Sequence, residues 1–375
     1  MTKHRAFNGD RFLDKFQGAE SILRSYVGIW GSGLDVDIES LDVAGFKDFI
    51  LVGDGALKDQ FMEGLYRAYD LCSEDGHEDL LAACQCQAEP YDPDPDGSLP
   101  VECLSLKVRA ENEDAFNLAY DRRALQQAER FSVFQGEAGR TIPDIQNAAL
   151  SLQALLSDRF KGDKNSDRVL LRHYQEGPYT NFIVYHEKRT KAMLVFEGPR
   201  TQVKVAPTVF RPAQQDLISY NSETGQVEIE AHFDKEGTSL RQGFAESCFG
   251  DPDLFDGPEA SVRFSLAAIA APDFALDVDD GDSAALVELH FKLDERHRPA
   301  FVVRSKNVLE TLELNGVREK LPKATITRAI LKIGFRDERR GKRVELSGTN
   351  KISFKRSTHA QDIFRYLRNW TILNA

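Results

Sequence analysis

Between residues 168 and 303, apolar and polar residues alternate in short runs, and this period of two constrains the fold more than any other feature. Successive side chains of a β-strand point to opposite faces, so such runs predict strands with one buried face. The runs are RVLLRHY, TNFIVYHE, AMLVFEG, QVKVAPTVF, DLISYN, QVEIEAHF, ASVRFSL, ALVELHFKL and AFVVRS. Turn residues bound them, which favours an antiparallel sheet. We therefore expect an antiparallel β domain over residues 163–322, with one inserted helix at 236–249.

The first 162 residues instead place apolar residues at the three- and four-residue spacing of helices. Helical stripes run from Phe12 and Phe16 through AFNLAYDRRALQQAERF to PDIQNAALSLQALLSDRF, while DFILV and VECLSLKV are short strand candidates. The polar segment KGDKNSDR separates helical from β periodicity, so we expect a domain boundary between residues 162 and 163. The predicted class is α+β, with a helical N-terminal region, a central antiparallel β domain and a small C-terminal unit.

The C-terminal unit, residues 323–375, is basic although the whole chain is acidic. It contains thirteen lysine and arginine residues against four aspartate and glutamate residues, a formal charge of +9, whereas the complete chain carries −12. Leu331 and Ile333 alternate with Arg328 and Lys332, which predicts a β-hairpin with one buried face and one cationic face. A terminal helix with apolar residues between 363 and 370 would cover the buried face. The sequence leaves open whether this hairpin-plus-helix unit packs on the β domain.

Lysine and arginine at β spacing suit the phosphate backbone of nucleic acid, because each neutralised phosphate releases counterions without demanding a particular base. We therefore expect salt-sensitive, largely sequence-independent binding of nucleic acid, with DNA as the first candidate. The expected contact residues are Arg328, Lys332, Arg336, Arg339, Arg340, Lys342, Arg343, Lys351, Lys355, Arg356, Arg365 and Arg368. A competing interpretation is that the basic unit docks on the acidic remainder of this chain or on an acidic protein.

Two of the predicted strands supply the candidate catalytic residues. The alternation groups Glu228, Glu230 and His232 on one strand, and Glu288, His290 and Lys292 on another. If these strands are neighbours, their side chains could bind a divalent cation or transfer protons. Otherwise they form an ordinary solvated face.

Known catalytic spacings are matched only in part. The distance from Glu288 to Lys292 is too long for the Glu-x-Lys of a metal-dependent nuclease. His186 and Lys188 have the His-x-Lys spacing of some phosphodiesterases, but the Asp that normally follows is missing. We therefore expect neither a metal nor a cofactor.

Taken together, these patterns favour a non-catalytic nucleic-acid-binding component of a multiprotein assembly, for which bacterial defence and DNA processing are candidate contexts. The alternatives are a metal-dependent nuclease or phosphodiesterase that uses the six candidate residues, and a protein–protein adaptor. No window approaches the roughly 18 apolar residues of a spanning helix. The charged start MTKHRAFNGDRF does not fit a secretory signal. We therefore expect a cytoplasmic protein with no membrane partner and with reduced cysteines.

Overall fold

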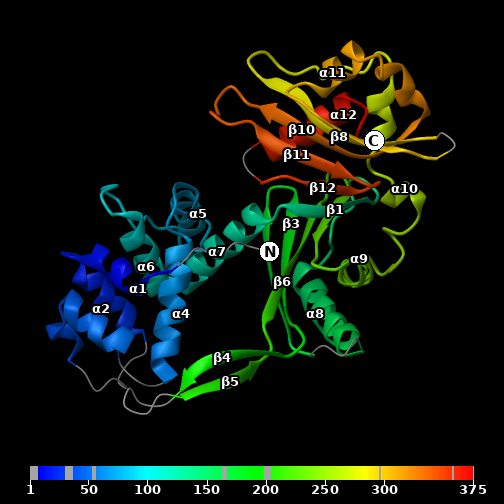
Figure 1. Ribbon diagram of the computed structural model, residues 1–375. Helices are drawn as coiled ribbons and strands as arrows, with labels where there is room; N and C mark the ends of the chain where they lie inside the picture. Colours follow the sequence, from blue (N-terminus) through cyan, green and yellow to red (C-terminus); the bar gives the residue numbers. More distant parts are fainter. Residues whose placement is uncertain are drawn as a thin grey trace. The chain divides into compact units, whose positions relative to one another are not determined.

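The computed structural model describes residues 7–29, 37–52, 56–162, 167–197, 204–294, 297–356 and 359–374. The chain divides into two compact units, residues 1–127 and residues 128–375. The predicted α+β class is confirmed, because helices build the first unit and a large antiparallel sheet dominates the second (Figure 1). None of the helices among the described residues has both the length and the apolar content that a bilayer crossing requires.

The first unit is helical, as its apolar spacing predicts. Its helices are α1 (Gly9–Leu13), α2 (Glu20–Gly28), α3 (Val43–Lys47), α4 (Ala56–Asp70), α5 (Glu74–Gln85), α6 (Val101–Glu111) and α7 (Glu113–Gln127). They share one core, in which Tyr26, Phe61, Leu104 and Phe116 are buried. The two strand candidates in this region were wrong: VECLSLKV lies in α6, and DFILV forms a π-helical turn, η4 (Asp48–Val52).

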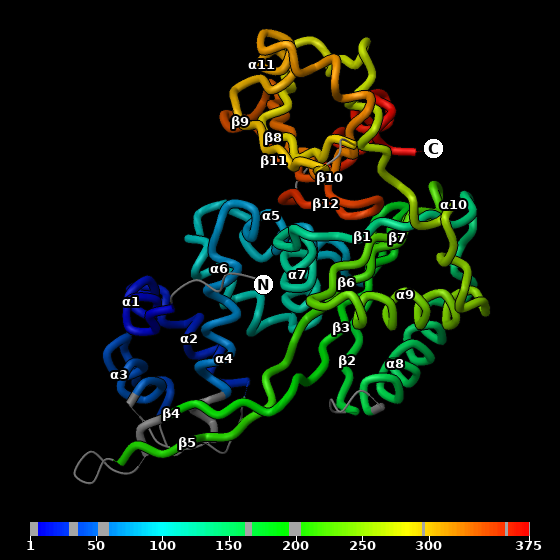
Figure 2. The backbone as a smooth tube through the Cα atoms, turned by 45° about the vertical axis from the view of Figure 1, so that its right-hand side comes forward, coloured from blue at the N-terminus to red at the C-terminus, as the bar shows by residue number. Residues whose placement is uncertain are grey.

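The second unit is organised by a ten-stranded sheet with the order β2-β3-β6-β7-β1-β12-β11-β10-β8-β9, in which all neighbours run antiparallel (Figures 1 and 2). Its strands are β1 (Arg130–Gln135), β2 (Val169–Glu176), β3 (Tyr179–Glu187), β6 (Ala213–Asn221), β7 (Gln226–Glu230), β8 (Ser283–Leu293), β9 (Ala300–Arg304), β10 (Ala324–Gly334), β11 (Lys342–Ser347) and β12 (Lys351–Ser353). A separate two-stranded ribbon consists of β4 (Lys191–Glu197) and β5 (Lys204–Phe210). The predicted strand ASVRFSL is absent, because α10 (Pro258–Ser261) covers its start and Phe264 makes only an isolated bridge.

Helices cover opposite faces of the two halves of this sheet. The helices α8 (Ile145–Gly162) and α9 (Asp234–Phe249) share a core with Ile229 of β7. Ser132 of β1 pairs with Ile229 on one side and with Lys351 of β12 on the other. Residues that are directly paired point to the same face of a sheet, so Lys351 lies on the same face as Ile229, the face that α8 and α9 cover farther along the sheet. The helix α12 (Ala360–Asn369) packs on the other face, where Phe364 contacts Phe354 edge-on. The outer face of β10, β11 and β12 is therefore the one turned away from α12.

The observed division of the chain differs from the expected boundary at residue 162. α8 packs against α9 and β2, so it belongs to the second unit. β1, which the helical pattern had absorbed, pairs with β7 on one side and with β12 on the other. Because β12 extends the sheet through β1, the basic hairpin is continuous with the central strands. η6 (Arg318–Lys323) and α11 (Val308–Leu314) connect β9 to β10.

Candidate functional site

The six candidate catalytic residues do not come together. β7 and β8 are separated in the sheet by β1, β12, β11 and β10, so the condition for a shared site is not met. β7 ends at Glu230, whose carboxylate accepts a hydrogen bond from the backbone N–H of Glu129. Burial raises the pKa of Glu230. His232 lies beyond the strand in an exposed position. Lys292 is exposed on β8. No catalytic centre follows from these two strands.

Glu228 and Arg356 instead form a buried ion pair. The side chain of Glu228 is 1% exposed and that of Arg356 is 10% exposed. The guanidinium carbon lies 4.2 Å from the centroid of the Phe131 ring, and Gln226 donates a hydrogen bond of 2.8 Å to Glu228 Oε1. Burial lowers the pKa of Arg356 to about 10, so it remains charged at neutral pH. Neither the solvated face expected for Glu228 nor the phosphate contact expected for Arg356 fits these positions.

Glu288 is the centre of a second ion-paired group on the outer face. His290 Nε2 lies 2.6 Å from Glu288 Oε1, and Arg304 Nε donates to Glu288 Oε2 at 2.7 Å. These hydrogen bonds, first that of His290 and then that of Arg304, lower the pKa of Glu288 to about 2. Arg328 bonds Glu345 at 2.7 Å and lies 3.9 Å from Glu288. This network fixes Arg328, so that only part of its charge faces solvent.

Several other expected contact residues are also held by carboxylates. Lys342 pairs with Glu338 at 2.7 Å, Lys351 pairs with Asp234 at 2.8 Å, and Arg365 bonds Asp279 at 2.7 Å and Asp362 at 3.1 Å. Arg365 and the exposed Arg368 belong to α12, on the opposite face of the sheet. Lys355 is exposed just after β12. The expected single surface is therefore divided between two faces and partly neutralised within the unit.

A smaller group of cations has no such partners within the described parts of the chain. Lys332 on β10 and Arg343 on β11 are directly paired across the strands, and both are exposed. Arg336, Arg339 and Arg340, in and before the turn that joins these strands, are also exposed. The acidic residues of that turn are engaged elsewhere, Glu338 with Lys342 and Asp337 with His359. Among the residues that the structure describes, no carboxylate lies at ion-pair distance from Lys332, Arg339 or Arg343, which we call the cationic strip.

A hollow of about 320 Å³ lies at the end of the cationic strip. Lys332 and Arg339 contribute to its wall, together with three glycines, Gly281, Gly334 and Gly341. A Cβ atom at Gly334 would lie 2.5 Å from Ser283 Oγ, so a side chain cannot be added there without displacement. Glu338 also reaches the hollow, but its carboxylate pairs with Lys342. The hollow therefore combines cationic side chains with a closely accessible backbone.

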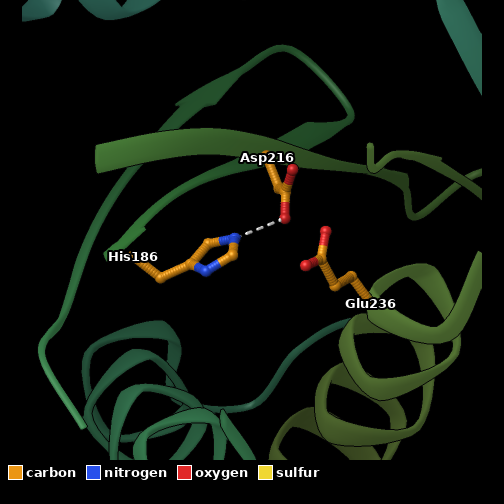
Figure 3. A group of neighbouring side chains, drawn as sticks. All are labelled: His186, Asp216 and Glu236. Carbon is orange, nitrogen blue, oxygen red and sulfur yellow. Dashed lines mark hydrogen bonds and ion pairs between the residues drawn. The ribbon is translucent and has the colours of Figure 1, made fainter. Parts of the chain in front are cut away.

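Another group of buried polar and ionisable side chains lies between β3, β6 and α9. His186 Nε2 is 2.9 Å from Asp216 Oδ2, and Glu236 approaches both from α9 (Figure 3). Lys188 pairs with Glu236, and Gln214 donates to Asp216 and Glu236. We call these five residues the His186 cluster. Phe160 stacks on the His186 ring, and an open hollow of about 490 Å³ adjoins it between α8 and β2.

The His186 cluster has the composition of a metal site, with ligand atoms of His186, Asp216 and Glu236 all within 4.8 Å of one another. Lys188 and Gln214, however, already neutralise and hydrogen-bond these carboxylates. A bound cation would have to replace Lys188 as the partner of Glu236. The arrangement as it stands is a buried ionic network that attaches α9 to the sheet.

The sequence contained a signal for the His186 cluster beyond the His-x-Lys spacing. His186 continues the inward series of Phe182 and Val184, and Asp216 continues that of Ile218 and Tyr220. Two ionisable residues at inward positions of paired strands predict a buried polar contact. Comparison with protein-family models and with curated proteins found no match.

Proposed function

We propose that the chain binds the phosphate backbone of nucleic acid through the cationic strip, with DNA as the first candidate. The observation that carries the proposal is the direct pairing of two exposed cations, Lys332 and Arg343. Like charges opposite each other on neighbouring strands destabilise a sheet. A polyanion laid across β10 and β11 would neutralise both charges, and the release of its counterions would favour the complex.

The surroundings of the cationic strip support the same ligand. Arg339 and Lys332 border a glycine-walled hollow in which a phosphate could approach the backbone closely. Lysine and arginine side chains suit contacts to phosphate oxygens, which carry no sequence information. Binding through these residues would therefore depend on salt and little on sequence.

A non-catalytic role is part of this proposal. Glu228 and Glu288, the acidic candidates that the sequence singled out, are both held in ion pairs by arginine. A carboxylate held in this way is a poor general base, because its partner lowers its proton affinity. We propose that the protein presents nucleic acid to other components of an assembly. An adaptor that binds an acidic protein is the alternative.

The test is a binding titration of the full chain with fluorescently labelled duplex DNA, single-stranded DNA and RNA at several salt concentrations. The variant Lys332→Glu/Arg343→Glu should bind roughly tenfold or more weakly, and loss of two phosphate contacts should reduce the salt slope by about 2. The matched control is Lys306→Glu/Lys320→Glu, which reverses two exposed lysines outside these strands. Equal loss in the control, or no loss in the first variant, would contradict the proposal. Tight binding of an acidic protein alone would favour the adaptor.

A further inference from the structure

The two-stranded ribbon β4–β5 has an apolar surface that the proposed function does not use. It extends beyond the main sheet from the ends of β3 and β6 (Figure 2). Leu194 is 71% exposed, Val209 is 65% exposed and Met193 is 55% exposed. Ala192 pairs with Val209, and Leu194 pairs with Pro207, so one side of the ribbon is apolar at consecutive cross-strand pairs. An isolated two-stranded hairpin is marginally stable in water, and exposed apolar groups of this kind mark interaction surfaces.

The two edges of the ribbon differ in their capacity to pair with another strand. β5 carries Pro207 at its centre, which removes a backbone N–H and is typical of edges protected from further pairing. β4 contains no proline, and among the strands that the structure describes it pairs with β5 alone. β4 is therefore an open edge whose backbone groups can accept another strand.

The charges of β4 identify the strand that fits this edge. The sequence of β4 is KAMLVFE, with a lysine at one end, a glutamate at the other and apolar residues between. When β4 is laid antiparallel to a copy of itself with Leu194 opposite Leu194, Lys191 falls opposite Glu197 of the second copy, and the reverse pair forms at the other end. In the register of the ribbon, position 197 is paired with Lys204 of β5 on its other side. Opposite charges across a strand pair stabilise it, whereas a parallel arrangement would place like charges together.

We propose that two copies of this chain associate through β4, forming a four-stranded antiparallel sheet with the order β5-β4-β4-β5 around a two-fold axis at Leu194. The interface is isologous, so it closes with two copies and leaves the proline-containing edges outside. The apolar side of each ribbon becomes part of a wider sheet face, as the stability of a hairpin requires. This association is independent of nucleic-acid binding.

The test is sedimentation velocity of the full chain without nucleic acid, at concentrations up to about 100 µM, where association with a micromolar Kd is nearly complete. The wild-type chain should reach twice the 42.2 kDa of one copy. Lys191→Glu and Glu197→Lys should each weaken the dimer roughly tenfold or more, because each creates two like-charge pairs across the β4–β4 interface. Lys306→Glu, a charge reversal outside the ribbon, should leave the dimer unchanged.

The charge pattern also predicts rescue. An equimolar mixture of Lys191→Glu and Glu197→Lys should form a heterodimer, because both end pairs across the β4–β4 interface again have opposite charges. The double variant Lys191→Glu/Glu197→Lys should dimerise with itself for the same reason. A wild-type chain that remains a monomer would overturn the inference. So would a dimer that tolerates both single reversals, or single variants that fail to rescue each other, since another partner or another surface would then occupy the ribbon.

Discussion

Replacing Arg356 by methionine should destabilise the second unit strongly, because it leaves the buried carboxylate of Glu228 without its cationic partner. The two side chains are 10% and 1% exposed, and the guanidinium lies against the rings of Phe131, Phe354 and Phe364. Breaking a buried pair from one side typically costs about 3–5 kcal/mol. The hydrogen bond from Gln226 to Glu228 remains and recovers only a small part of this cost. We therefore expect a loss of about 3–5 kcal/mol in the free energy of unfolding.

The assay is urea unfolding followed by the fluorescence of Trp370 in a Trp30→Phe background, since the chain contains only these two tryptophans. Trp370 stacks on Tyr366 in the second unit, so its signal reports that unit. Arg343→Met is the matched control, an exposed arginine for which a change within about 0.5 kcal/mol is expected. The double variant Arg356→Met/Glu228→Gln should be more stable than Arg356→Met, because no unpaired charge stays buried. A cost no larger than that of the control, or costs that simply add in the double variant, would refute the reasoning.

Three further changes test the interior of the two units. Asp79 is 7% exposed and burial raises its pKa from 3.8 to about 6. Because the folded state therefore favours the protonated form, the free energy of unfolding should fall as pH rises from 4 through 6. In chemical unfolding, Asp79→Asn should raise the free energy of unfolding by about 1–3 kcal/mol at pH 7.5, and this gain should vanish near pH 4. Gly64→Ala should cost about 1–3 kcal/mol by thermal unfolding instead of gaining helix propensity, because the new Cβ would lie 2.0 Å from Tyr26 Oη; a rise in stability would contradict this. Lys188→Met should lower the free energy of unfolding by about 2–4 kcal/mol, because it leaves Glu236 without its cationic partner. Millimolar Mn²⁺ should raise the thermal midpoint of this variant but not that of the wild type, and equal shifts of the two midpoints would disprove this expectation.

The local patterns of the sequence were sufficient for much of the fold. Leu331, Ile333, Val344 and Leu346 alternate as predicted and are all buried, and the apolar stripe of the terminal helix is buried from Ile363 to Trp370. Strand alternation and helical spacing are properties of neighbouring residues, so they can be read without knowledge of the fold. The segment VECLSLKV was predicted wrongly as a strand, because a short apolar run fits a buried helix and a buried strand equally well, and this run is buried on most sides in α6.

The sequence by itself determined that the last fifty-three residues are basic, alternate in polarity and end in an amphipathic helix, because charge and period are fixed by composition and spacing. Only the tertiary structure decided which cations remain without carboxylate partners. Arg356 meets Glu228 and Lys351 meets Asp234 because β12 joins the sheet through β1, which brings together residues more than a hundred positions apart. Lys332 and Arg343 meet each other instead of an acid because the register of β10 and β11 places them opposite. Strand order and register depend on packing over the whole sheet, and no local pattern contains them.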